Sequence, residues 1–99
     1  MKLNNRMAVS IAVAAVLAAC STAPERIEPL EAARVIVPEV EASARAGVAP
    51  TNIANARKSL DEADRLADAR GKLADIEFHA QNAVTHAQIA QEKILTVEA

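Results

Sequence analysis

The chain has 99 residues, a formal net charge of −2 and 52% apolar residues. That length allows one small domain, which excludes an enzyme built from two domains around a large pocket. Phe78 is the only aromatic residue, and the basic residues are scattered along the chain. Neither base stacking nor a basic patch therefore supports nucleic-acid binding.

The segment 1–19 is typical of a signal peptide. Lys2 and Arg6 precede the run 7–19, which holds apolar and small residues and is interrupted only by Ser10. A basic stretch followed by an apolar run of this length is the pattern of a secretory signal. As a helix the run would span about 20 Å, short of the roughly 30 Å core of a bilayer. We therefore expect removal of this segment rather than a permanent membrane helix.

The apolar run ends in Leu17-Ala18-Ala19-Cys20, which resembles the lipobox of bacterial lipoproteins. Small residues admit a protease to the bond between Ala19 and Cys20, and the Cys20 thiol accepts a diacylglyceryl group. Cleavage frees the Cys20 amine for a further acyl chain such as palmitate, and two or more chains anchor a protein stably. We expect lipidation at Cys20, the only cysteine. The alternative is an ordinary secretory signal that happens to end near a cysteine.

Ser21 bears on the destination of such a lipoprotein. In Gram-negative lipoproteins, Asp after the lipidated Cys resembles an inner-membrane retention signal, and Ser does not. The expected location is therefore the outer membrane, with the protein facing the periplasm. Residues 20–29 are interpreted as the lipidated Cys and a tether, because Pro24, Pro29 and several charges leave no apolar period.

Residues 30–99 are predicted to form an all-α domain rich in alanine, the best helix former. Apolar residues recur at spacings of three and four in three segments: Leu30, Ala33, Val37, Val40, Ala44; Ile53, Ala56, Leu60, Ala63, Ala67; and Leu73, Ile76, Ala80, Ala83, Ala87, Ala90, Ile94, Val97. This heptad spacing predicts an antiparallel hairpin of helices at about 51–69 and 72–97, joined by a short turn at Gly71.

The first apolar segment leaves two helix models open, because Pro38 interrupts it. An interior proline removes a hydrogen bond, whereas a proline in the first turn does not. The segment is therefore either one helix from Leu30 that kinks at Pro38, or a new helix that starts at Pro38. In both models the helix ends near Gly47.

Opposite charges lie four residues apart at Arg57/Asp61, Lys58/Glu62 and Asp61/Arg65. Each such pair stabilises a helix by about 0.2–0.5 kcal/mol. They are interpreted as a solvated helix face without functional meaning.

The stretch 40–94 is similar to a family of Ala-rich helical domains of unknown function in Gram-negative envelope lipoproteins. The matching residues are Gly47-Val48-Ala49-Pro50 and Ala56-Arg57-Lys58-Ser59-Leu60-Asp61-Glu62-Ala63. In longer relatives this domain precedes an OmpA-like peptidoglycan-binding domain. The resemblance implies a helical fold and an envelope location, and it implies no activity.

His79 and His86 are the residues most suited to metal or proton chemistry. They are seven positions apart, which is about 10.5 Å of helical rise, whereas two ligands of one ion on a helix are three or four apart. The serines stand in no nucleophile motif, and no glycine-rich phosphate loop is present in the sequence. The sequence therefore predicts no catalytic residue, no cofactor and no metal site, so we expect a protein that is not an enzyme.

Phe78, Thr85 and Ile89 lie off the heptad positions of the last segment. Either the first helix covers them, or they form an exposed contact patch for a partner or a second copy. We expect a lipid-anchored structural or interaction module that contacts the membrane through Cys20 and binds an envelope protein or itself. The alternative is an accessory module that binds peptidoglycan or another ligand.

Overall fold

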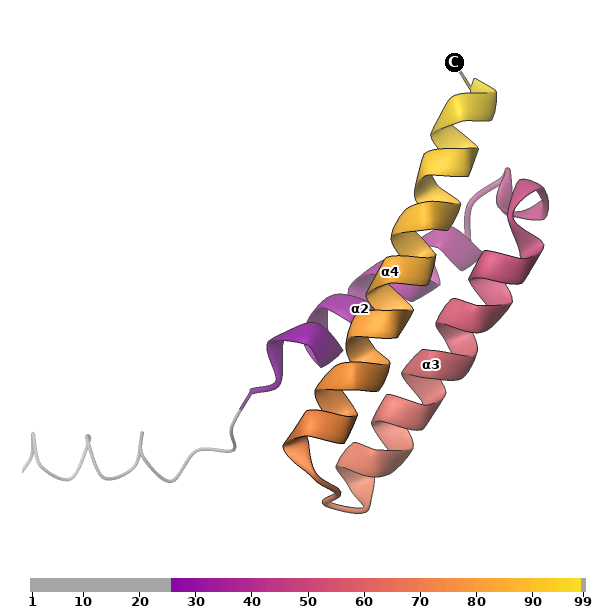
Figure 1. The fold of residues 1–99 in the computed structure, drawn as a ribbon. Helices are drawn as coiled ribbons and strands as arrows, with labels where there is room; N and C mark the ends of the chain where they lie inside the picture. The colour runs from indigo at the N-terminus through magenta and orange to yellow at the C-terminus, as the bar shows by residue number, and fades with distance from the viewer. Residues whose placement is uncertain (1–25, 99) are drawn as a thin grey trace, which may run out of the picture.

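The computed structural model describes residues 26–98, with side chains to Val97. In chain order the elements are α2 (Glu28–Glu41), the short 3-10 helix η1 (Ala46–Val48), α3 (Pro50–Asp68) and α4 (Leu73–Glu98). The ribbon shows α3 and α4 side by side as an antiparallel hairpin, with α2 crossing behind them (Figure 1). The predicted all-α fold is thus confirmed over the described residues.

The seam of the hairpin is built from small residues. Ala80, Ala83, Ala87 and Ala90 of α4 have no exposed surface, and alanine side chains let two helix backbones approach closely. Within α4, the heptad positions that are not buried are those at its two ends, Leu73 and Val97, which are exposed. The remaining core residues are all aliphatic: Leu30, Ala33, Val37, Val40, Ala49, Ala56, Leu60, Ala63, Ile76 and Ile94.

Helix α2 begins two residues earlier than the expected boundary of the tether. Glu28 is its first residue, and Pro29 stands in its first turn. A proline is tolerated there because the first backbone N–H groups of a helix have no partner within the helix. The carboxyl end of the expected tether, residues 28 and 29, is therefore part of the helix.

Pro38 stands inside α2, and the helix continues through it to Glu41. Of the two models, a new helix starting at Pro38 is therefore wrong. The burial of Val37 and Val40 on either side of Pro38 offsets the lost backbone hydrogen bond, since burying a valine contributes about 1.5–3 kcal/mol.

The end of α2 differs from the prediction. The last hydrogen bond of the helix joins the Ala42 N–H to the Pro38 carbonyl at 3.0 Å, several residues before Gly47. Ala44, which shares the heptad spacing, is exposed and lies in the connection to η1. The expected helix to Gly47 is therefore wrong, and a bent connection carries the chain from α2 back to α3.

The turn between α3 and α4 has the hydrogen bonds of a Schellman motif. The Gly71 N–H donates to the Leu66 carbonyl at 2.8 Å, and the Arg70 N–H donates to the Ala67 carbonyl at 3.1 Å. Arg70, with φ of 55°, takes the left-handed position usually given to glycine. Gly71 instead allows close approach, because an added Cβ would lie 3.2 Å from the Leu66 carbonyl oxygen.

Candidate functional site

Phe78 and Ile89 lie on the same exposed face of α4. They are eleven residues apart, which at about 100° per residue places them about 20° apart around the helix axis. Their exposed fractions are 61% and 38%, and Thr85 between them is also exposed. This arrangement follows from the heptad spacing, which turns the alanines of α4 inward and leaves these three residues on the opposite side.

Helix α2 does not cover this face. Its buried residues, Leu30, Ala33, Val37 and Val40, join the alanines of α3 and α4 in one core. In Figure 1 α2 therefore lies behind the hairpin, with α4 between it and the viewer. The first of the two explanations for Phe78 and Ile89, burial under the first helix, is wrong.

A second apolar surface adjoins Ile89 near the carboxyl end of α4. A shallow depression there is lined by Ile89, Val97, polar residues of α4 and Val48 of η1. Lys93 stands at its edge, and its Nζ donates a hydrogen bond to Asn52 Oδ1 of α3 at 2.7 Å. The place of Val48 could not be read from helical periodicity, since it comes from a three-residue helix in a connection.

The histidines face a different depression, between α3 and α4. Its lining includes Asn55, Ser59, His79, Asn82 and His86. The His86 Nδ1 is buried with no hydrogen-bond partner. The His79 ring meets the neighbouring Phe78 ring edge-on, with centroids 5.2 Å apart.

Within residues 26–98 there is no cluster of three or more His, Cys, Asp or Glu side chains that could hold a metal ion. Asp75 precedes His79 by four residues, a spacing that suits a shared ion, but no third ligand joins them. The histidine depression offers amides, a hydroxyl and imidazoles for hydrogen bonding. Its lining also includes charged residues: Glu41, Arg57, Lys58, Asp61, Glu62 and Arg65.

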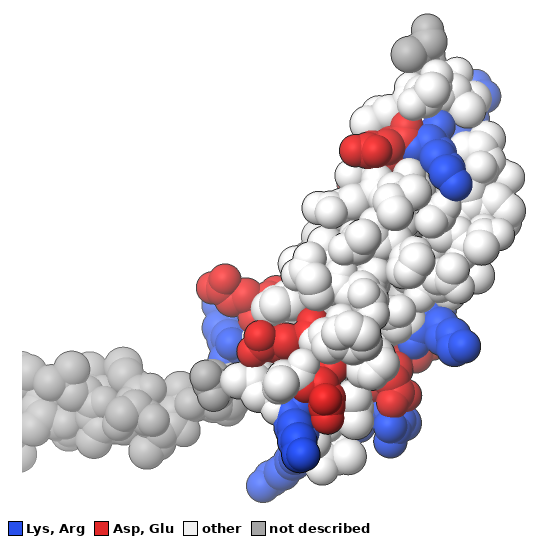
Figure 2. Space-filling model, in the orientation of Figure 1, with Lys and Arg blue, Asp and Glu red and all other residues white. Residues whose placement is uncertain are grey.

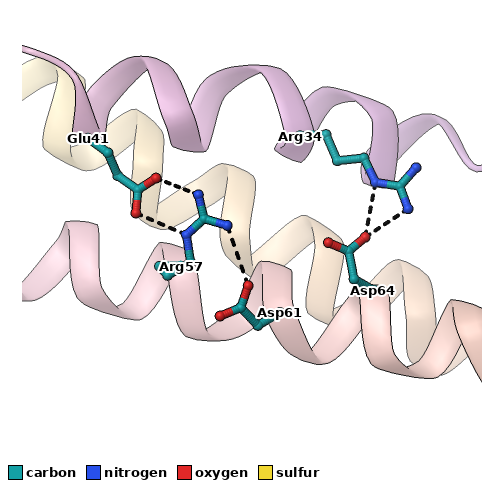
Figure 3. A network of polar contacts seen from close by, with 5 residues as sticks. All are labelled: Arg34, Glu41, Arg57, Asp61 and Asp64. Atoms are coloured by element: carbon teal, nitrogen blue, oxygen red, sulfur yellow. Dashed lines mark hydrogen bonds and ion pairs between the residues drawn. The ribbon is translucent and has the colours of Figure 1, made fainter.

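Ion pairs join α2 to α3 (Figure 3). Arg34 Nε and Nη2 donate to Asp64 Oδ1 at 3.0 and 2.8 Å. Arg57 Nε donates to Glu41 Oε2 at 2.9 Å, and its Nη2 donates to the other oxygen of that carboxylate. These contacts cross between helices, and sequence spacing did not indicate them.

The hydrogen bonds from Arg57 hold the pKa of Glu41 below its ordinary value of 4.5, and Glu41 in turn raises the pKa of Arg57. Of the three pairs with i,i+4 spacing, the structure contains Arg57–Asp61 at 3.4 Å. Arg65 does not bond to Asp61 but donates to Glu62, through Nε at 2.9 Å. That hydrogen bond lowers the pKa of Glu62.

The predicted signal peptide 1–19, its cleavage bond at Ala19 and Cys20, and Ser21 lie outside the described residues. Among the helices of residues 26–98, none is long and apolar enough to cross a membrane. Comparison of the chain with protein-family models, with curated proteins and with solved structures found no significant match. The inference of function therefore rests on the sequence pattern and on the surfaces described above.

Proposed function

We propose that this chain is a lipid-anchored lipoprotein of the Gram-negative outer membrane that acts as a structural or interaction module in the periplasm. The exposed position of Phe78 and Ile89 on one face of α4 is the observation that supports the interaction. An apolar patch that stays exposed marks a contact surface, and these two residues share one side of α4 with no charged residue between them in the sequence.

The anchor is supported by the sequence Leu17-Ala18-Ala19-Cys20. The tether is short: residues 21–27 lie between Cys20 and the first residue of α2, and they reach at most about 25 Å when extended. The helical domain is thereby held near the membrane surface. Membership of the Ala-rich family of envelope lipoproteins is part of the same proposal.

Replacing Cys20 tests the anchor directly. Cys20→Ser in the full chain removes the thiol that would carry the lipid, so the precursor should remain uncleaved and carry no acyl mass. In the wild type, intact-mass measurement should show loss of residues 1–19 and the added mass of the acyl chains. Ser10→Ala, inside the same segment, is the matched control and should leave processing unchanged. A processed wild type without acyl mass contradicts the lipoprotein proposal.

A second candidate function is binding of peptidoglycan or another polar ligand in the histidine depression. Its amide, hydroxyl and imidazole groups, together with its charged side chains, can form hydrogen bonds with sugars and peptides. Co-sedimentation of the full chain with purified peptidoglycan sacculi tests this candidate. The variant Asn82→Ala should reduce the bound fraction, whereas Asn52→Ala, outside the lining residues, should not; equal binding by both variants rejects the depression as the site.

A further inference from the structure

The exposed face of α4 carries a four-residue stripe: Phe78, Asn82, Thr85 and Ile89, spaced four, three and four. No Asp, Glu, Lys or Arg occurs between Glu77 and Glu92, although 24% of the whole chain is charged. The space-filling view shows the middle of α4 white, with charged side chains gathered toward the two ends of the hairpin (Figure 2). The stripe is therefore free of charge. Phe78, Thr85 and Ile89 in it are exposed, and Asn82 is half-buried.

We propose that this stripe binds the same stripe of a second copy, with the two α4 helices antiparallel about a two-fold axis. Such an axis gives a self-complementary contact, in which residue i meets residue j and j meets i. With the axis between positions 83 and 84, Phe78 packs on Ile89 of the second copy. Asn82 then lies beside Thr85 of that copy, where its amide can donate to the hydroxyl. Each of the four side-chain pairs of the contact therefore joins either two large apolar residues or two polar residues.

The absence of charge in the stripe allows a second copy to bind, because a two-fold contact brings the equal charges of the two copies together and a charged stripe would repel itself. An anionic lipid surface attracts amphipathic helices through Lys and Arg, and residues 78–91 contain neither. Asp75 and Glu92 follow beyond the two ends of the stripe, and in the antiparallel pairing these like charges meet. The contact is therefore limited to the stripe itself.

A contact of four residues from each copy is small. The proposed dimer therefore depends on the proposed lipid anchor to bring two copies together. Two modules tethered to one surface meet at a high effective concentration, so a weak contact becomes populated. A two-fold axis normal to the membrane lets both tethers reach the same leaflet. The pair would then lie with its α4 helices along the membrane plane.

The mass of the full chain after chemical crosslinking in the intact envelope tests whether the stripe is an interface. Loss of an anchor side chain from an interface costs about 2 kcal/mol or more, which is about thirtyfold in affinity. We expect Phe78→Ser to shift the crosslinked mass from dimer to monomer while the helical melt stays unchanged, because Phe78 is exposed. Val35→Ser is the matched control, since Val35 is 68% exposed on α2 and lies outside the stripe. A lowered melt with unchanged mass overturns the proposal.

Cysteine crosslinking in the intact envelope tests the antiparallel geometry. In the pairing, positions 78 of the two copies are offset by about 16.5 Å along the helices, and positions 85 by only about 4.5 Å. Disulfides need Cα atoms within about 7 Å. With copper–phenanthroline as oxidant, Thr85→Cys should therefore crosslink by itself. Phe78→Cys and Ile89→Cys should crosslink only when the two variants are co-expressed.

The outcomes separate this proposal from the lipid anchor. Crosslinking of Phe78→Cys with itself indicates a parallel contact, and a crosslink to a different protein indicates another partner; either result overturns the antiparallel pair. Absence of any crosslink above the level of Val35→Cys also overturns it. A disulfide dimer of the wild type, whose only cysteine is Cys20, reports instead a free thiol there. That result contradicts lipidation without bearing on the stripe.

Discussion

Helix α3 contacts its two neighbours in different ways. Toward α4 it presents a dry seam in which Ala56, Leu60 and Ala63 face the alanines of α4. Toward α2 it adds ion pairs at the edge of the same core, Arg34–Asp64 and Glu41–Arg57. The seam tolerates little added volume because the backbones are close. The edge contacts are solvated, so each contributes little. The difference indicates that the α3–α4 contact is the one most sensitive to added volume, and that the α2–α3 contact is the one sensitive to pH.

Enlarging the seam should have the largest effect. Ala83→Leu adds three carbons at a position without exposed surface, and overpacking costs about 1–3 kcal/mol. The free energy of unfolding, measured by urea titration with circular dichroism, should fall by this amount. Ala54→Leu makes the same change at an exposed alanine of α3 and is the control. Equal stability of the two variants would mean that the α3–α4 contact is not close-packed.

The seam is also what could be predicted from the sequence. Heptad spacing encodes which side of a helix is buried, so the central positions from Ile76 to Ile94 were correctly predicted. The end of α2 was not, because no residue near Glu41 signals a stop: Gly47 is six residues away and has open space around it. The pair Glu41–Arg57 joins residues 16 apart in sequence, and only the placement of α2 brings them together. Helical spacing suggested Asp61 instead, which is the weaker partner.

The candidate site was predictable to the same degree. Spacing alone separated Phe78 and Ile89 from the seam. It did not tell whether the first helix would cover them, because the side on which α2 docks is a tertiary choice between two faces of the hairpin. Val48 was missed for a related reason, since it approaches Ile89 from a connection without periodicity.

A substitution in the turn between α3 and α4 should change the free energy of unfolding less than Ala83→Leu does, and in the opposite direction. Arg70 is held at φ 55°, a conformation that costs a residue with a Cβ about 1–2 kcal/mol and costs glycine little. Arg70→Gly should therefore raise the free energy of unfolding. The gain should be only about 0.5–1 kcal/mol, because the extra chain entropy that glycine loses on folding offsets part of the relieved strain. Gly71→Ala should lower it, since the added Cβ would press on Leu66 at 3.2–3.3 Å. A loss of stability in Arg70→Gly contradicts the assignment of the left-handed residue.

The smallest expected effect tests the edge of α2, and it depends on pH. The Glu41 carboxylate has its pKa lowered by the hydrogen bonds from Arg57. A lowered pKa in the folded state means that the pair contributes its full stability above pH 4.5 and loses it as the pH falls through the folded pKa.

A double-mutant cycle measures this contribution. Because both side chains are partly solvated, the cycle of Glu41→Gln and Arg57→Gln should give a coupling energy of about 0.2–1 kcal/mol. The coupling, followed by denaturant titration from pH 7 to pH 3, should decrease below pH 4.5. A coupling that stays constant over this range would show that the contact of Glu41 with Arg57 does not depend on the carboxylate charge.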